Sequence, residues 1–186
     1  MAKNDKNVIT LGSGKLFAVT FTSTASIPDL ETMCVEANRL GWIKGGASVE
    51  YTPSSQEVKD DLGMVSKIIV TQEEAILKTG IMTWNGETLA KLCDTGRVTT
   101  DTTNHIRTCK IGGIDNADNT DYVIVFEYDD VADGKKWIRI VGRNSGGFSF
   151  SFKADEATVI DAEFHCAPKL DNAGTLIELI EELDAS

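Results

Sequence analysis

The sequence predicts a mainly β fold, an antiparallel β-sandwich or barrel with one short flanking α-helix. Apolar and polar residues alternate over many short runs, turn residues separate these runs, and one segment instead has apolar residues at helical spacing. The chain of 186 residues is 41% hydrophobic and 25% charged, which excludes a wholly disordered or collagen-like protein. We expect one domain over residues 1–186, since no linker-like stretch divides the chain.

Strands are predicted wherever the alternation has a period of two. Residues 17–21 alternate large apolar side chains with smaller or polar ones, which indicates a half-buried strand. Residues 148–152, with the sequence FSFSF, form the clearest pattern, and we expect their three rings on one face of a strand, as part of the core. The other predicted strands are 47–51, 66–72, 75–82, 105–111, 122–128, 136–141, 159–166 and 176–180.

Turn residues and one helix interrupt these strands. Asp133 and Gly134 predict a hairpin between two strands, and the NSGG sequence at 144–147 ends the next strand. Residues 85–93 begin with the capping residue Asn85 and predict a short amphipathic helix. The residues that fall at helical spacing within it are Leu89, Leu92 and Cys93.

Two stretches do not fit the strand pattern. Residues 52–65 are long and charged for a connection between strands, yet they include Val58, Leu62 and Met64. A monomer has little against which to bury these side chains, so we expect them to dock on a neighbouring molecule; an ordinary surface loop is the alternative. Residues 1–14 are polar and predict an N-terminal arm or, equally, a frayed end.

The chain is acidic, with 29 acidic and 18 basic residues and a net charge of -11. Such a charge repels nucleic acid and anionic membranes, so a sequence-reading DNA-binding module is not expected. An acidic surface that faces DNA without gripping it remains compatible with this charge. The N-terminal sequence has no apolar stretch long enough for a signal peptide or a spanning helix, so we expect no membrane insertion and no export from the compartment of synthesis.

No metal or other cofactor is expected. The cysteines lie far apart without a CxxC pair, which favours free structural thiols in a reducing cytoplasm. His105 lies near Cys109 and His165 precedes Cys166, but structural zinc sites usually combine paired short spacings. The four cysteines are Cys34, Cys93, Cys109 and Cys166.

Catalytic motifs are incomplete, and the sequence predicts no enzyme. The GSGK sequence at 12–15 imitates a phosphate-binding loop, but Ile9 and Leu16 stand where that loop needs a glycine and a magnesium-binding hydroxyl. A nucleophile-elbow motif is absent from the sequence. A hydrolase that uses His165 with Asp161 is therefore the weakest of the functional hypotheses.

Four longer passages, in a fixed order, cover most of the chain. They are LGSGKLFAVTF at 11–21, GWIKGGASVEYTPSSQEVKDDLGMVSK at 41–67, EEAILKTGIMTWNGETLAKLC at 73–93 and IVGRNSGGFSFSFKADEATVIDAEFHC at 140–166. With these passages the chain resembles the major tail tube proteins of tailed bacteriophages that infect Gram-positive hosts. The inner-tube proteins of type VI secretion systems have a related fold.

The resemblance implies a structural virion protein that assembles into hexameric rings. The rings would stack into a hollow tube around a tape-measure protein, and the tube would later conduct DNA into the host. Further implied partners are tail terminator and baseplate proteins, and a sheath protein where the tail is contractile. The implied location is the virion tail, after synthesis in the host cytoplasm. Contractile and non-contractile tails, and phage-derived bacteriocins or injection devices, all fit the resemblance.

The resemblance also assigns residues to subunit contacts, because in that family a long loop and an N-terminal arm reach the neighbouring subunit or ring. Carried onto this sequence, it assigns residues 51–65 to such contacts, with apolar anchors and charges that set the register. The anchors are Val58, Leu62 and Met64, the charges are Lys59, Asp60 and Asp61, and Tyr51 and Pro53 complete the set.

A tube for DNA must let a polyanion slide without sticking, and an acidic lumen does this by repulsion. The candidate lumen residues are Glu50, Asp161 and Glu163, polar strand positions whose neighbours in sequence face the core. Ordinary exterior carboxylates are the equal alternative.

A soluble β-sandwich binding module, adhesin-like or carbohydrate-binding, is the main alternative function. Trp42, Trp84 and Trp137 would then form a platform for a sugar. Each tryptophan lies beside a turn or a strand, however, so a core or interface position explains it more simply.

Overall fold

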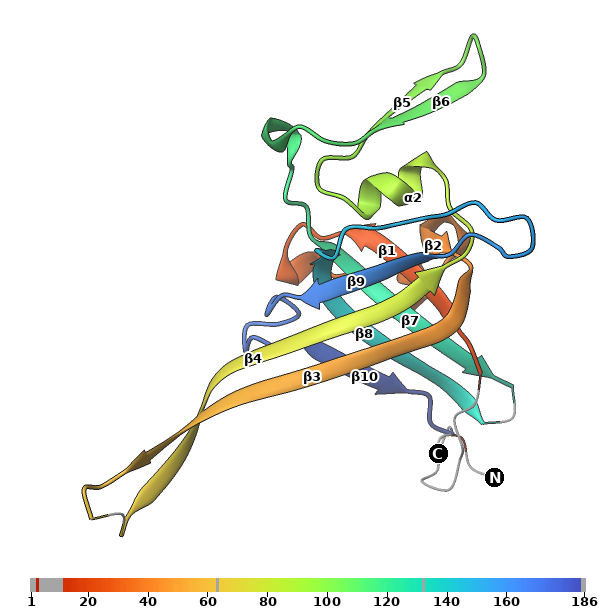
Figure 1. The fold of residues 1–186 in the computed structure, drawn as a ribbon. Helices are drawn as coiled ribbons and strands as arrows, with labels where there is room; N and C mark the ends of the chain where they lie inside the picture. Colours follow the sequence, from red (N-terminus) through yellow and green to blue (C-terminus); the bar gives the residue numbers. More distant parts are fainter. Residues whose placement is uncertain (1–2, 4–11, 63, 132, 185–186) are drawn as a thin grey trace.

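The computed structural model describes residues 3, 12–62, 64–131 and 133–184. It confirms the predicted fold class, with one antiparallel sheet of eight strands, a separate two-stranded hairpin and short helices beside them (Figure 1). The strands are β1 (Lys15–Thr20), β2 (Arg39–Gly41), β3 (Ile43–Lys59), β4 (Ser66–Ile81), β5 (Arg97–Asp101), β6 (Ile106–Lys110), β7 (Tyr122–Asp130), β8 (Gly134–Asn144), β9 (Ile160–Cys166) and β10 (Ile177–Glu181). The helices are α1 (Leu30–Met33) and α2 (Gly86–Lys91), with 3-10 turns η1 (Thr24–Ser26), η2 (Glu36–Asn38) and η3 (Ile114–Asn116).

The sheet folds back on itself into two layers. Its strand order is β2-β1-β7-β8-β9-β4-β3, and β10 also pairs with β8. Residues 136–140 of β8 pair with β10, whereas residues 142–144 pair with β9. A back layer of β1, β7, β8 and β10 is thus crossed by a front layer of β9, β4 and β3 (Figure 1). This arrangement is sandwich-like.

The main core fills the space between the two layers. Leu77 of β4 and Phe164 of β9 pair directly and are fully buried. Ile124 of β7 and Ile140 of β8 also pair directly and belong to the same buried cluster. Burial of such side chains stabilises the fold by about 25 cal/mol for each Å² of apolar surface removed from water. The core therefore requires that the two layers pack together.

A second core lies on the opposite face of the back layer. Phe17, Val125 and Val141 are buried there against Met33 of α1 and Leu170 of the connection after β9. Because side chains cover both of its faces, β7 is apolar almost without alternation. The back layer is thus the most deeply buried part of the molecule.

The helix predicted at residues 85–93 is confirmed as α2. Asn85 caps its first turn by accepting hydrogen bonds from two backbone N–H groups, at 2.9 and 3.0 Å. Leu89 and Leu92 then reach the main core from one face of the helix. The cap and the apolar face together place α2 on the flank of the sheet (Figure 1).

The strand predicted at residues 148–152 is wrong. These residues lie in the connection between β8 and β9, and no described strand pairs with them. Phe148 packs against the main core, whereas Phe152 is largely exposed. Phe148 stacks on Phe150, and Phe152 meets Phe150 edge to face. Phe150 also stacks on Trp84, at 5.1 Å between ring centroids. Ring stacking thus produces a period-two pattern without the hydrogen bonds of a sheet.

Two further segments, β5 and residues 1–14, were not predicted as strands or lie mostly outside the described residues. The strand β5 lies outside the predicted set and pairs with β6 to form a hairpin. Most of the predicted N-terminal arm, residues 1–14, lies outside the described residues. Lys3 is described, and its ammonium contacts the carboxylate of Glu182 beside the end of β10 at 2.6 Å.

Candidate assembly interface

The region predicted as a loop, residues 52–65, instead forms most of a β-hairpin that projects from the body (Figure 1). β3 continues to Lys59, β4 begins at Ser66, and the two strands pair along their length, so we call residues 52–74 the arm. The loop prediction is wrong because Pro53 and the serines after it are typical of turns. Proline is tolerated here since β3 is the terminal strand of the sheet, and one side of its backbone pairs with no strand of the described residues.

Asp60 closes the turn at the tip of the arm. Its backbone N–H donates to the carbonyl of Val65 at 3.0 Å, and the Val65 N–H donates to the Asp60 carboxylate at 2.8 Å. The latter hydrogen bond lowers the pKa of Asp60 below its usual value, because it favours the charged carboxylate. The tip therefore carries a fixed negative charge at neutral pH.

All of the predicted contact residues are exposed. They are Tyr51, Pro53, Val58, Lys59, Asp60, Asp61, Leu62 and Met64. Val65, at the end of the predicted range, is also exposed, and the structure adds exposed apolar residues beyond that range, namely Ile68, Ile69 and Val70. The signal that could have found the last three is their position side by side in a predicted strand, where alternation would have kept one face polar.

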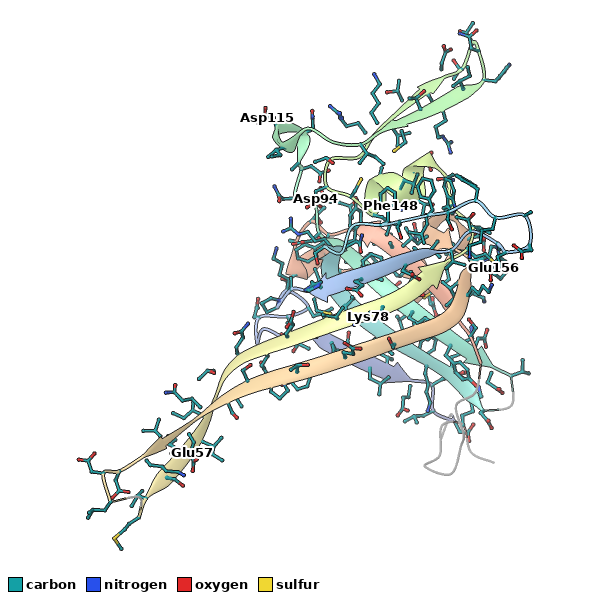
Figure 2. All side chains as sticks on the ribbon, viewed as in Figure 1. Glu57, Lys78, Asp94, Asp115, Phe148 and Glu156 are labelled. Carbon is teal, nitrogen blue, oxygen red and sulfur yellow. The ribbon has the colours of Figure 1, made fainter. Side chains whose placement is uncertain are left out.

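Apolar side chains lie on both faces of the arm. Val58 and Ile69 share one face, and Ile68 and Val70 share the other, as the pairing register requires. Figure 2 shows side chains standing out on both sides of the ribbon around Glu57, away from the rest of the chain. An isolated two-stranded hairpin is marginally stable in water. The arm thus has the apolar surface of an interface and no cover within the described chain.

The three candidate lumen residues share one face of the front layer. Asp161 and Glu163 alternate along β9 with residues of the main core, and Glu50 lies on the same side of β3, so we call this side the outer face. The Lys78 ammonium, labelled in Figure 2, lies 2.9 Å from the Glu50 carboxylate and 4.0 Å from that of Glu163. Its hydrogen bond with Glu50 raises the pKa of Lys78. Sequence reasoning did not include this lysine, which neutralises part of the acidic cluster.

A shallow depression of about 460 Å³ occupies the outer face, lined by Lys44, Lys78, Asp161 and Glu163 among others. His165 also lies on this face. The carboxylate in contact with His165 belongs to Glu74, at 3.5 Å, although Asp161 was its expected catalytic partner. The face has four carboxylates and two lysines, so it remains acidic: Glu50, Glu74, Asp161, Glu163, Lys44 and Lys78.

The sheet ends at β2 on one side and β3 on the other. β3 is 17 residues long, and within the described residues β4 is its one partner strand. The free side of such a strand presents backbone N–H and C=O groups that readily pair with another chain. The edge of β3 is therefore a second surface suited to association.

The three tryptophans do not form a single platform. Trp42 and Trp84 line a depression beside α2, where the guanidinium of Arg39 lies 4.2 Å from the Trp42 ring centroid. Trp137 lies in the second core, and its indole N–H donates to buried Glu127 at 3.0 Å. Trp84 instead belongs to an aromatic cluster with Phe150 and Phe152, both of which are exposed.

Within the described part of the chain, no group of three or more His, Cys, Asp and Glu side chains is placed to hold a metal ion. Burial raises the pKa of the Cys34 and Cys166 thiols to about 11, so both stay protonated near neutral pH. None of the described helices has the length and apolar character needed to cross a membrane.

No protein-family model matches the chain, and a search of curated proteins also gives no match. The arm, the outer face and the open edge of β3 are therefore the features of the molecule that bear on its function.

Proposed function

We propose that the protein is a self-assembling structural subunit, the tail tube protein of a tailed bacteriophage or of a related injection device. The observation that carries this proposal is the arm, which leaves the body as a paired ribbon with apolar side chains exposed on both faces. Contact with water costs about 25 cal/mol for each Å² of such surface, and a neighbouring copy that covers it removes this cost. The resemblance to tail tube proteins supplies the form of the assembly, which is hexameric rings stacked into a tube.

The open edge of β3 supports ring formation. In a ring, two unlike surfaces of the subunit meet at every interface, and the rotation between neighbours closes the assembly. A strand edge that pairs with the next subunit extends the sheet around the ring. Such pairing also protects a long edge from uncontrolled aggregation.

The outer face suits the inside of a tube that carries DNA. Its carboxylates outnumber its lysines, and Lys78 already contacts Glu50 and Glu163. Phosphates would find few free cations there and would be repelled at long range, so DNA would slide without being held. We therefore assign the outer face to the bore of the tube.

Electron microscopy and sedimentation of the purified protein test assembly. We expect rings or tubes whose amount rises with concentration. Replacement of residues 55–71 by Asn-Gly joins Ser54 to Gln72 through a favoured two-residue hairpin turn, and this variant should fold but remain monomeric. A wild-type chain that stays monomeric at every concentration would overturn the proposal.

The bore assignment has its own test in the triple variant Glu50→Lys, Asp161→Lys and Glu163→Lys. Its tubes should form but conduct DNA poorly, because the bore would then bind phosphate. Glu156→Lys, on the exposed connection before β9, is the control for a single reversal of charge away from the outer face. If the triple variant delivers DNA as well as the wild type does, these carboxylates lie on the exterior of the tube.

A soluble carbohydrate-binding module is the second candidate, and the aromatic stack favours it. Phe152 is 76% exposed and Phe150 stacks on Trp84, so ring faces are available to a sugar. Titration with a panel of glycans, followed by tryptophan fluorescence, separates the candidates. A saturable change that Phe152→Ala abolishes would support the binding module; a flat response would count against it.

A further inference from the structure

The β5–β6 hairpin differs in charge from the arm. Residues 97–111 include three basic residues and one acidic residue, in a chain whose net charge is -11. Residues 55–70 of the arm include three acidic and two basic residues. Figure 1 shows both hairpins projecting from the body, the arm at the lower left and β5–β6 at the top beyond α2. The molecule thus has two protrusions of opposite charge.

Two cations of the β5–β6 hairpin lie together on its outward face. Arg97 pairs directly with Lys110, so their side chains share one face of the ribbon. Arg107 lies on the other face, where its guanidinium contacts Glu87 of α2 at 3.0 Å, and this contact identifies the inward side. Like charges directly opposite each other destabilise a ribbon. An anionic partner on the outward face would relieve this repulsion.

Nearby groups of the hairpin leave the two cations available. Arg97 donates to the backbone carbonyl of Gly112 at 3.2 Å, which holds the side chain in place but does not neutralise it. Asp101 shares their face, but its carboxylate accepts hydrogen bonds from two backbone N–H groups of the hairpin turn, at 2.9 and 3.0 Å. Lys110 has no salt bridge within the described residues. The outward face is therefore a cationic surface.

The tip of the arm presents the complementary charge. Lys59 is paired with Glu57 at 3.0 Å, so it does not offset the two aspartates that follow it. Asp60 is held ionised by the turn, as described above, and Asp61 beside it is exposed. The end of the arm thus has two anionic side chains, as many as the cationic side chains on the outward face of the β5–β6 hairpin.

The apolar residues around these charges also match. Leu62 and Met64 follow the aspartates in the chain and are more than four-fifths exposed, at 81% and 82%. On the hairpin side, Ile106 shares the outward face with Lys110 and is 56% exposed, and Ile114 of η3, which follows β6, is 91% exposed. Exposed apolar side chains beside complementary charges are typical of a specific contact, in which the apolar part supplies affinity and the charges fix the register.

We propose that the tip of the arm of one copy docks on the outward face of the β5–β6 hairpin of another copy. Asp60 and Asp61 would face Arg97 and Lys110, with the apolar residues of both segments packed around them. The tip and the hairpin of a single chain lie far apart in Figure 1, so the contact requires two copies. Because each chain has one tip and one acceptor, the contact repeats head to tail. This inference rests on the proposed assembly and names the surface that receives the arm.

Charge reversal on each side tests the contact, with assembly measured by sedimentation and electron microscopy at low ionic strength, where surface charges are least screened. Asp61→Lys and Lys110→Glu should each raise the protein concentration at which assembly begins by roughly tenfold, because an attraction becomes a repulsion. Lys153→Glu, in the connection before β9, makes the same change of charge as Lys110→Glu and should assemble like the wild type.

Mixing the two variants gives the decisive result. Each variant alone brings together like charges. In an equal mixture, the reversed tips of the Asp61→Lys chains meet the reversed hairpins of the Lys110→Glu chains, and the unchanged tips meet the unchanged hairpins. Assembly should therefore recover in the mixture, and also in the chain that carries both changes.

Docking is overturned if the single variants assemble like the wild type, or if neither the mixture nor the double variant recovers. If the wild type forms tubes in the same experiment, the proposed function stands even when the docking contact fails. If the wild type forms none, the proposed function itself is contradicted.

Discussion

Two strands of this molecule have the same kind of sequence in opposite surroundings. Residues 123–125 of β7, Val-Ile-Val, are 1%, 0% and 0% exposed, because side chains cover both faces of that strand. Residues 68–70 of β4, Ile-Ile-Val, are 69%, 44% and 56% exposed in the arm. An unbroken apolar run is typical of a strand that is buried on both faces. The arm therefore has the sequence of a buried strand without the cover.

The strand β4 contains the boundary between the two kinds of surroundings. From Ala75 to Ile81 every second residue is buried, whereas every residue from 66 to 74 is exposed. The body half follows the alternation expected of a strand with one face in the core. The arm half follows no such alternation, so we interpret its apolar residues as the contact surface for a neighbouring molecule.

The largest expected change in the free energy of unfolding comes from a direct comparison of the two halves of β4. Leu77→Ala removes a fully buried side chain between the layers and should lower the free energy of unfolding by about 3–5 kcal/mol. Ile69→Ala, in the arm half of the same strand, should lower it by less than about 1 kcal/mol. Urea denaturation of the dilute chain measures both values. Similar costs at the two positions would break the distinction between body and arm.

Buried hydrogen bonds of one side chain connect β8, β9 and the end of α2. Their loss should have the next largest effect on the free energy of unfolding. Buried Asn144 donates to the carbonyls of Leu92 and Gly147, at 2.8 and 2.7 Å, and accepts from the N–H of Glu163 at 2.8 Å. Asn144→Ala leaves these groups unpaired and should cost about 2–3 kcal/mol in the same denaturation experiment. Exposed Asn172→Ala is the control and should change stability little. An equally small change at Asn144 would mean that other contacts join β8, β9 and α2.

Substitutions in the arm should have the smallest effect on stability, yet they should strongly weaken assembly. Ile68→Thr with Val70→Thr keeps a β-branched side chain at each position but makes one face of the arm polar. The free energy of unfolding of the monomer should change by less than about 0.5 kcal/mol, since both side chains are exposed. The concentration needed for assembly, measured by sedimentation, should rise. Unchanged assembly would remove this face of the arm from the interface.

The body of the fold could be predicted from local pattern, because burial of one face imposes alternation on each strand. Residues 85–93 could likewise be predicted as a helix, since the cap and the apolar spacing are local. The arm could not, because Pro53 and its serines are typical of turns and the exposed half of the hairpin lacks the alternation that a core imposes. Residues 148–152 misled the prediction because stacked rings imitate the period of a strand.

The candidate interface could be predicted in part. Val58, Leu62 and Met64 were identifiable as apolar residues with nothing nearby to bury them, and all three are exposed. Lys78 could not be recognised as the partner of Glu50 and Glu163, because these contacts depend on the register of β4 with β3 and with β9, which is distant in sequence. Register is set by the packing of the whole sheet.

Hydrogen exchange in the dilute chain and in the assembled protein tests the central claim most directly. We expect the backbone amides of residues 66–70 to exchange quickly in the dilute monomer and to become strongly protected on assembly, because a neighbouring copy covers the arm. The amides of residues 123–125 should be protected in both states and serve as the internal reference. Equal exchange of the arm amides in the two states would contradict the claim that the arm is an assembly element.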